Sequence, residues 1–249
     1  MAETSEIQWT DATFNPWIGC TQVSPACDHG YAMVTNQHRR WAKGWGPGVP
    51  RHRTSTDNWR KPLAWNRKAE REGKRTKVFC ASLADVFDSE VDDSWRSDLW
   101  RLIEQTPNLD WLLLTKRTAS VAGMVPWGEN WPDIVWIGTS VENQKYADLR
   151  LPVLSALPAR VRFISADPLL GDFSLDGFNV DWVIVGGESG KGWRPLNIDH
   201  VRSLRNQCQE REVSFFFKQH AAFNPHKLGR ELDGREWNEF PRPIAAASI

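Results

Sequence analysis

The sequence predicts an α/β fold, a complete or partial parallel (β/α) barrel of the TIM type. Short apolar runs recur along the chain, and stretches with helical periodicity lie between them. The runs are too short for core helices, and most are rich in β-branched or aromatic residues, which is typical of buried strands. They occupy residues 78–81, 111–114, 134–137, 161–164, 182–185 and 215–217.

A first strand is expected near residues 13–18, and amphipathic helices are predicted over 93–105, 144–157 and 198–211. In the first of these helices, Trp95, Leu99, Leu102 and Ile103 fall on one face. Strands that alternate with helices indicate a parallel sheet with right-handed crossovers. The count is about seven strands, which favours a barrel over a flat doubly wound sheet.

The composition indicates a globular chain, with 41% hydrophobic residues and a formal net charge of zero. No apolar stretch approaches the roughly 20 residues of a membrane helix, and the first residues do not resemble a secretory signal. The four cysteines do not suggest a disulfide framework, so we expect a cytoplasmic protein without membrane partners. We predict a single domain over residues 1–249, with an irregular basic insertion at about 44–61 and a C-terminal appendage at about 224–249.

The charge is unevenly distributed along the chain. Between Arg39 and Lys77, thirteen lysines and arginines face only three carboxylates, and tryptophans are interleaved with them. Such a segment could follow a nucleic-acid backbone and stack on bases, so nucleic acid is a predicted partner through residues 39–77. The alternative is a solvated helix followed by a basic loop.

Polar residues follow six consecutive predicted strands. Parallel α/β folds place their functional residues at the carboxyl ends of the strands, so we expect these side chains to share a cavity. Turn formation favours Gly, Asn, Asp and Pro, and it does not require charged side chains at these places. The residues predicted to position a substrate are Lys116, Glu142, Asp167 and Lys218.

A glycine-rich run, Gly186-Gly187-Glu188-Ser189, follows the strand at 182–185. Glycines at a strand end allow a ligand to approach the backbone, and successive N–H groups can bind an anion. We therefore predict that these four residues bind a cofactor. A tight turn with a surface carboxylate is the alternative.

Two cysteines near the N-terminus, Cys20 and Cys27, are separated by a turn, and His29 follows closely. Thiolates near a strand end are ligands for soft metals and iron–sulfur clusters, and imidazole can also ligate iron. The three residues are the predicted metal ligands. A zinc site made by the same three residues is one alternative, and two buried thiols with a packing role are another.

Several motifs resemble the Gp37/Gp68 family of phage and prophage proteins (DUF5131). They are the runs at residues 7–21, 59–63, 79–87, 111–117, 138–143, 185–190 and 215–219, so the resemblance extends over nearly the whole chain. Family members usually have a third cysteine where this chain has Gly30. That cysteine triad on a barrel is similar to the cluster loop of radical S-adenosylmethionine (SAM) enzymes.

The resemblance implies a phage-encoded, radical-SAM-like protein in the host cytoplasm, with a degenerate iron–sulfur loop that lacks the third cysteine. It implies a [4Fe–4S] cluster held by Cys20 and Cys27, with a third ligand from His29, Asp28 or Cys80. It also implies that the run ending in Glu188 meets the amino group of SAM. The implied reaction is radical modification of a nucleic acid or nucleotide, and the alternative is a non-catalytic protein that binds a host macromolecule such as a host protein.

Overall fold

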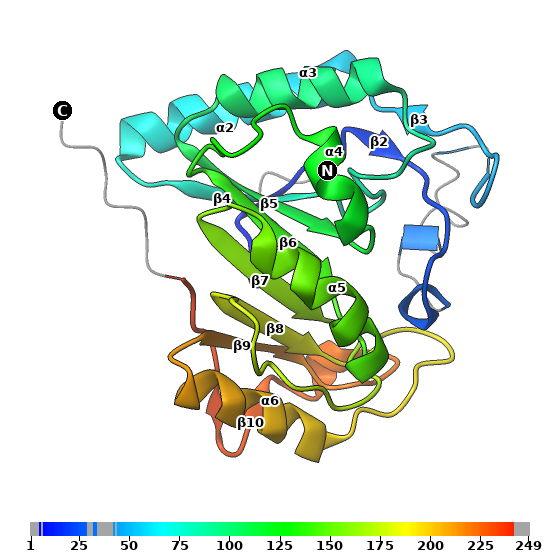
Figure 1. Cartoon of the computed structure of the whole chain (residues 1–249), viewed down its shortest axis with the longest axis vertical. Helices are drawn as coiled ribbons and strands as arrows, with labels where there is room; N and C mark the ends of the chain where they lie inside the picture. Colours follow the sequence, from blue (N-terminus) through cyan, green and yellow to red (C-terminus); the bar gives the residue numbers. More distant parts are fainter. Residues whose placement is uncertain (1–4, 6, 29–31, 34–41, 43, 242–249) are drawn as a thin grey trace.

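The computed structural model describes residues 5, 7–28, 32–33, 42 and 44–241, and its centre is a seven-stranded parallel sheet (Figure 1). The strand order is β1-β4-β5-β6-β7-β8-β9, so each strand pairs with the next one along the chain. The two edge strands do not pair with each other in the described part, and the sheet curls into a half-barrel. This confirms the predicted partial parallel barrel. The strands are β1 (Ala12–Thr13), β4 (Thr76–Cys80), β5 (Leu109–Thr115), β6 (Val135–Ser140), β7 (Val161–Ala166), β8 (Trp182–Gly186) and β9 (Ser214–Gln219).

Four long helices connect successive strands and cover the convex face of the sheet (Figure 1). The predicted helices are confirmed to within one residue at their ends. Side chains cap the starts of three of them, since Ser55 accepts a hydrogen bond from the Asn58 amide, Asp92 from the Ser94 amide and Asn197 from the Asp199 amide. The helices are α2 (Thr56–Glu72), α3 (Asp93–Glu104), α5 (Gln144–Ala156) and α6 (Ile198–Glu210), with a short α4 (Val121–Met124) after the single turn η2 (Thr118–Ser120).

Alternation along the strands separates two hydrophobic clusters. Along β8, Val183 and Val185 pack toward the helices, whereas Trp182 and Ile184 belong to the cluster inside the half-barrel. This period of two is what a strand requires when both of its faces are buried. Trp9 lies inside the half-barrel, and its ring contacts Phe79 and Trp182.

The first predicted strand, 13–18, is divided. Its beginning forms β1 in the main sheet, whereas β2 (Trp17–Ile18) leaves the sheet and pairs in an antiparallel manner with β3 (His52–Arg53). Pro16 has no N–H to donate to a neighbouring strand, which explains the break at this point. The irregular insertion also ends earlier than residue 61, because α2 begins at Thr56.

The C-terminal appendage packs against the edge of the sheet. It contains the single turn η3 (Pro225–Lys227) and a hairpin made by β10 (Glu231–Leu232) and β11 (Arg235–Glu236). Trp237 then packs edge-on against Phe215, with ring centroids 5.7 Å apart. Among the described residues, no helix has the length and apolar character needed to cross a membrane.

Candidate functional site

A cavity of about 250 Å³ lies at the carboxyl ends of the strands. Its walls come from the segment 20–28, which includes the single turn η1 (Pro25–Cys27), and from the carboxyl ends of six strands, β4 to β9, or the loops that follow them. The half-barrel therefore brings together side chains that are up to 199 positions apart, as Cys20 and Gln219 are. The predicted site residues that line the cavity are Cys20, Cys27, Lys116, Asp167, Gly187, Glu188, Ser189 and Lys218.

Two predicted site residues do not line the cavity. Glu142 is 1% exposed and pairs with Arg150 at 2.9 Å, where the guanidinium also lies over the ring of Tyr146. Gly186 is the last residue of β8 and is not among the residues that line the cavity. The buried ion pair of Glu142 fixes α5 against the end of β6. Glu142 therefore has a structural role in the packing of α5 and does not line the cavity. His29, like Gly30, lies outside the described residues.

The two glycines of the glycine-rich run make room for other parts of the chain. A Cβ on Gly187 would lie 2.4 Å from the backbone nitrogen of Ala221, and a Cβ on Gly186 would lie 2.7 Å from Oδ1 of Asp167. Both distances are far below van der Waals contact. The close approach that requires glycine here is therefore made by the chain itself, which accounts for both residues without a cofactor.

Two ion pairs on the cavity wall neutralise most of the predicted charges. Lys218 pairs with Asp167, which joins the ends of β9 and β7. Glu188 is 7% exposed and accepts hydrogen bonds from the Arg194 backbone N–H at 2.7 Å and from its guanidinium. The hydrogen bond to Glu188 raises the pKa of Arg194. In this arrangement the carboxylate of Glu188 is engaged by an arginine of its own loop.

Arg194 also connects the two loops on either side of the cavity. Its guanidinium donates to the carbonyl oxygen of Pro25 at 2.9 Å and lies 3.6 Å from the carboxylate of Asp28. Both partners belong to the segment that carries Cys27. One side chain thus holds the cysteine segment against the loop after β8.

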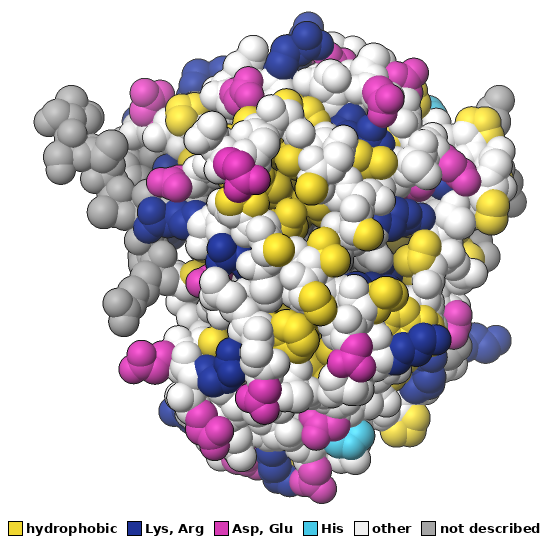
Figure 2. Space-filling model, viewed as in Figure 1, with side chains coloured by type: hydrophobic (Ala, Val, Ile, Leu, Met, Phe, Trp, Pro, Cys, Tyr) yellow, Lys and Arg dark blue, Asp and Glu magenta, His cyan; other side chains and the backbone are white. Residues whose placement is uncertain are grey.

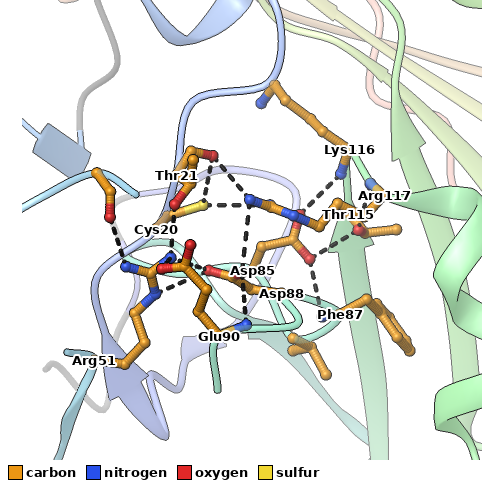
Figure 3. A network of polar contacts seen from close by, with 12 residues as sticks. Cys20, Thr21, Arg51, Asp85, Phe87, Asp88, Glu90, Thr115, Lys116 and Arg117 are labelled. Carbon is orange, nitrogen blue, oxygen red and sulfur yellow. Dashed lines mark hydrogen bonds and ion pairs between the residues drawn. The ribbon is translucent and has the colours of Figure 1, made fainter. Parts of the chain in front are cut away.

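A second network surrounds Cys20 (Figure 3). The guanidinium of Arg117 lies 3.4 Å from Sγ of Cys20, 3.1 Å from Asp85 and 2.9 Å from the carbonyl oxygen of Thr21. Burial, followed by the negative charge of Asp85, raises the pKa of Cys20 to about 11, although Arg117 acts in the opposite direction. The thiol of Cys20 is therefore protonated at neutral pH.

Arg51 extends this network below the cavity floor (Figure 3). Its side chain is 1% exposed, and it contacts Asp88 at 2.7 Å, Glu90 at 2.8 Å and Oγ1 of Thr21 at 2.8 Å. Arg51 and Arg117 together fix Thr21, and with it the start of the cysteine segment. The position of Cys20 is determined by these arginines.

Lys116 differs from the other charged residues of the cavity. Its backbone N–H donates to Asp85 at 3.1 Å, but its side chain extends away from the network, as Figure 3 shows. Within the described residues, no carboxylate forms an ion pair with its ammonium group. Among the described residues, the three carboxylates that line the cavity, Asp85, Asp167 and Glu188, are each paired with a basic side chain, whereas Lys116 has no such partner.

The thiols present do not fit a three-thiolate cluster. Cys20 and Cys27 line the cavity, but Cys80 is fully buried in the cluster on the helix side of the sheet, and Cys208 is buried on α6. Cys80 therefore cannot supply the third ligand that the resemblance implies. Among the described residues, no three His, Cys, Asp or Glu side chains are arranged to hold a metal ion.

Much of the basic segment 39–77 is occupied by internal ion pairs. Arg53 pairs with Asp98, Arg75 with Asp110 and Lys77 with Asp11. Residues 39–41 and 43 lie outside the described part of the chain. Nucleic-acid binding through this segment remains a prediction, and fewer of its charges are available than the sequence suggests.

The sequence analysis identified most of the cavity residues but missed the arginines that organise them. Arg51, Arg117 and Arg194 act on residues that lie 37, 97 and 169 positions away. No local sequence pattern predicts contacts between residues so far apart along the chain. The only signal was that Arg117 lies three residues after the end of the predicted strand 111–114.

Comparisons with known proteins give a family but no function. Residues 4–241 match the family described as "Protein of unknown function (DUF5131)", and no curated protein matches the chain. Similar solved structures include a mutant spore photoproduct lyase with bound AdoMet and dinucleoside spore photoproduct, at 12% identity and a TM-score of 0.48, covering 81% of this chain and 62% of that chain. A complex of the lyase with the dinucleoside has 12% identity and a TM-score of 0.46, with coverage of 78% and 59%. The chain thus spans about three fifths of these lyase chains, and it belongs to the DUF5131 family.

Proposed function

We propose that this DUF5131 protein binds a nucleoside derivative with an anionic group in the cavity at the mouth of its half-barrel. The observation that carries the proposal is the ammonium group of Lys116, which has no carboxylate partner among the described residues, in a cavity whose other described charges are paired. A single unpaired cation favours a ligand with one compensating negative charge.

The remaining walls suit the body of such a ligand. Trp45, Phe79 and Leu114 provide apolar surface, and Ser82 and Gln219 provide hydrogen-bonding groups beside it. Planar bases pack well against apolar and aromatic side chains while their edges form hydrogen bonds. Pockets that bind small molecules commonly combine these two kinds of surface.

Calorimetric titration with S-adenosylmethionine and, separately, with adenosine monophosphate tests the proposal. The resemblance of the glycine-rich run to SAM-binding motifs makes SAM the first ligand to examine. We expect Lys116→Ala to weaken binding by roughly tenfold, because it removes a charge-assisted hydrogen bond. The matched control is Lys74→Ala, an exposed lysine just after α2. If neither ligand binds, or if Lys116→Ala binds as tightly as the native protein, the proposal is wrong.

The proposed function does not involve an iron–sulfur cluster. Among the described residues, only two thiols, those of Cys20 and Cys27, line the cavity. Anaerobic reconstitution with iron and sulfide examines this point. We expect the native protein to remain colourless, and Gly30→Cys to become brown if it restores a third thiolate. A stable cluster on the native chain would contradict our reading of the cysteine segment.

The family resemblance also supports a phage origin and a location in the host cytoplasm, as parts of the same proposal. The alternative function, binding of a host macromolecule without catalysis, would gain support if both ligands fail to bind.

A further inference from the structure

Three loops around the cavity carry exposed hydrophobic side chains. Phe223 is 71% exposed, Leu228 is 59% exposed and Trp193 is 40% exposed, although most large hydrophobic residues of the chain are buried. Val23, on the cysteine segment, is 41% exposed. We name Trp193, Phe223 and Leu228 the apolar rim. Exposed apolar side chains gathered at one place indicate a binding surface more strongly than the same residues scattered singly.

Backbone contacts hold these loops beside one another. The N–H of Gly190 donates to the carbonyl oxygen of Phe223 at 3.1 Å, and Ser189 forms a parallel bridge with Ala222. Arg194, next to Trp193, reaches the carbonyl oxygen of Pro25 on the cysteine segment. Trp193 and Phe223 therefore lie on the two loops that carry or contact Glu188 and Ser189, which line the cavity.

Two lysines lie close to the apolar rim along the chain. Lys191 precedes Trp193, and Lys227 precedes Leu228, and both are exposed. Within the described residues neither forms an ion pair, whereas the nearby carboxylate of Asp28 is engaged by Arg194. Basic and hydrophobic side chains also lie next to one another on the right of Figure 2, the side toward which the strands of Figure 1 point.

We infer that the cavity mouth binds single-stranded nucleic acid, with one nucleotide in the cavity and neighbouring bases against Trp193 and Phe223. The inference rests on the proposed function and names its substrate class. Single strands are bound by aromatic side chains that stack on bases and by cations that follow the phosphates, and the rim offers both. Enzymes and binding proteins that act on one base place that nucleotide in a pocket while its neighbours remain outside. This interface differs from the segment 39–77, where several charges are paired internally.

Fluorescence anisotropy with a labelled oligothymidylate of about 12 nucleotides tests the inference. We expect the double variant Trp193→Ala/Phe223→Ala to bind at least about fivefold more weakly, because it removes two stacking surfaces. Lys191→Ala should reduce the steepness of the salt dependence by about 0.7 in the log–log slope, because one phosphate contact is lost. The matched control is Leu149→Ala, which removes a 63% exposed residue on α5, away from the cavity. Circular dichroism establishes that each variant is folded.

The outcomes separate this inference from the proposed function. If the native protein binds adenosine monophosphate but binds the oligonucleotide no more tightly, the inference is wrong and the proposed function stands. If the double variant binds the oligonucleotide as the native protein does, stacking on the rim is excluded. Equal affinity for a labelled duplex would also overturn the inference, because paired bases are not free to stack. If no nucleotide of any length binds, both proposals are wrong.

Discussion

The two ends of the half-barrel interior differ in how they are filled. At the amino ends of the strands, Trp9, Phe163 and Trp182 pack against one another and leave little room. At the carboxyl ends, ion pairs and hydrogen bonds surround a cavity of about 250 Å³. The same concave surface thus has a packed end, which stabilises the fold, and an open end, where charged side chains are held in place. The comparison teaches that rigidity at the open end comes from directional polar contacts.

The largest expected effect concerns the packed end. Trp182→Ala removes a ring that is fully buried and that contacts Trp9, Trp136, Phe163 and Phe216. We expect it to lower the free energy of unfolding by about 3–5 kcal/mol, because the cavity left behind is not refilled. Urea denaturation measures the change. Trp193→Ala, at an exposed position, should change stability by less than about 0.5 kcal/mol. If both variants lowered the free energy of unfolding by a similar amount, the packed end would not be the part of the interior that stabilises the fold.

The polar end should be almost as sensitive at its buried arginine. Arg51→Ala leaves the buried Asp88 with only the more distant guanidinium of Arg117, at 3.8 Å, so we expect a loss of about 3 kcal/mol in the free energy of unfolding. Arg60→Ala is the matched control, because its pair with Asp57 is largely exposed and should contribute less than about 1 kcal/mol. Chemical denaturation of both variants gives the comparison. A small effect of Arg51→Ala would mean that water reaches the network and that the floor of the cavity is not rigid.

A smaller effect is expected where the glycine-rich run meets the loop after β9. Gly187→Ala places a Cβ against the Ala221 backbone, which must move, and we expect a cost of about 1–3 kcal/mol. Gly123→Ala, on α4, meets no atom within 4 Å and serves as the control. Thermal unfolding of the two variants distinguishes them. A neutral Gly187→Ala would indicate that this glycine is not required by the packing of the chain.

The smallest effect is chemical and concerns Cys20. Since burial and Asp85 raise its pKa to about 11, the thiol stays protonated as the pH rises past the ordinary cysteine range. The folded protein favours the protonated thiol, so the stability that this preference contributes is fully present below about pH 8.5 and is lost as the pH rises toward 11. Alkylation with iodoacetamide, followed by mass spectrometry across pH, should show Cys20 reacting only at high pH. Rapid modification of Cys20 at pH 8 would contradict the described environment.

Much of the fold could be predicted because its signals are local. Short β-branched and aromatic runs predicted β4 to β9, and the apolar periodicity predicted α3, α5 and α6. The division of the first strand was missed because it depends on where β2 finds its partner, β3, some 35 positions later. The beginning of α2 was missed, because residues 44–61 were assigned to an irregular insertion, whereas the helix begins at Thr56 after the cap at Ser55.

The candidate site was predicted only in outline. Polar residues after successive strands do meet at one cavity, as parallel topology requires. Glu142, however, is turned into a buried pair with Arg150, because α5 passes over the end of β6 and presents its guanidinium there. Cys80 lies on the helix side because of the strand alternation, which no count of cysteines reveals.

The sequence by itself predicted a parallel barrel, complete or partial, and the edge of the sheet at which the charged residues gather, because hydrophobic periodicity and the alternation of strands with helices are local properties of the chain. The tertiary structure decided which of those charges are neutralised and which one, Lys116, is left unpaired. Ion pairs such as those of Arg117 and Arg194 join segments far apart along the chain, so their formation depends on distances that exist only after folding.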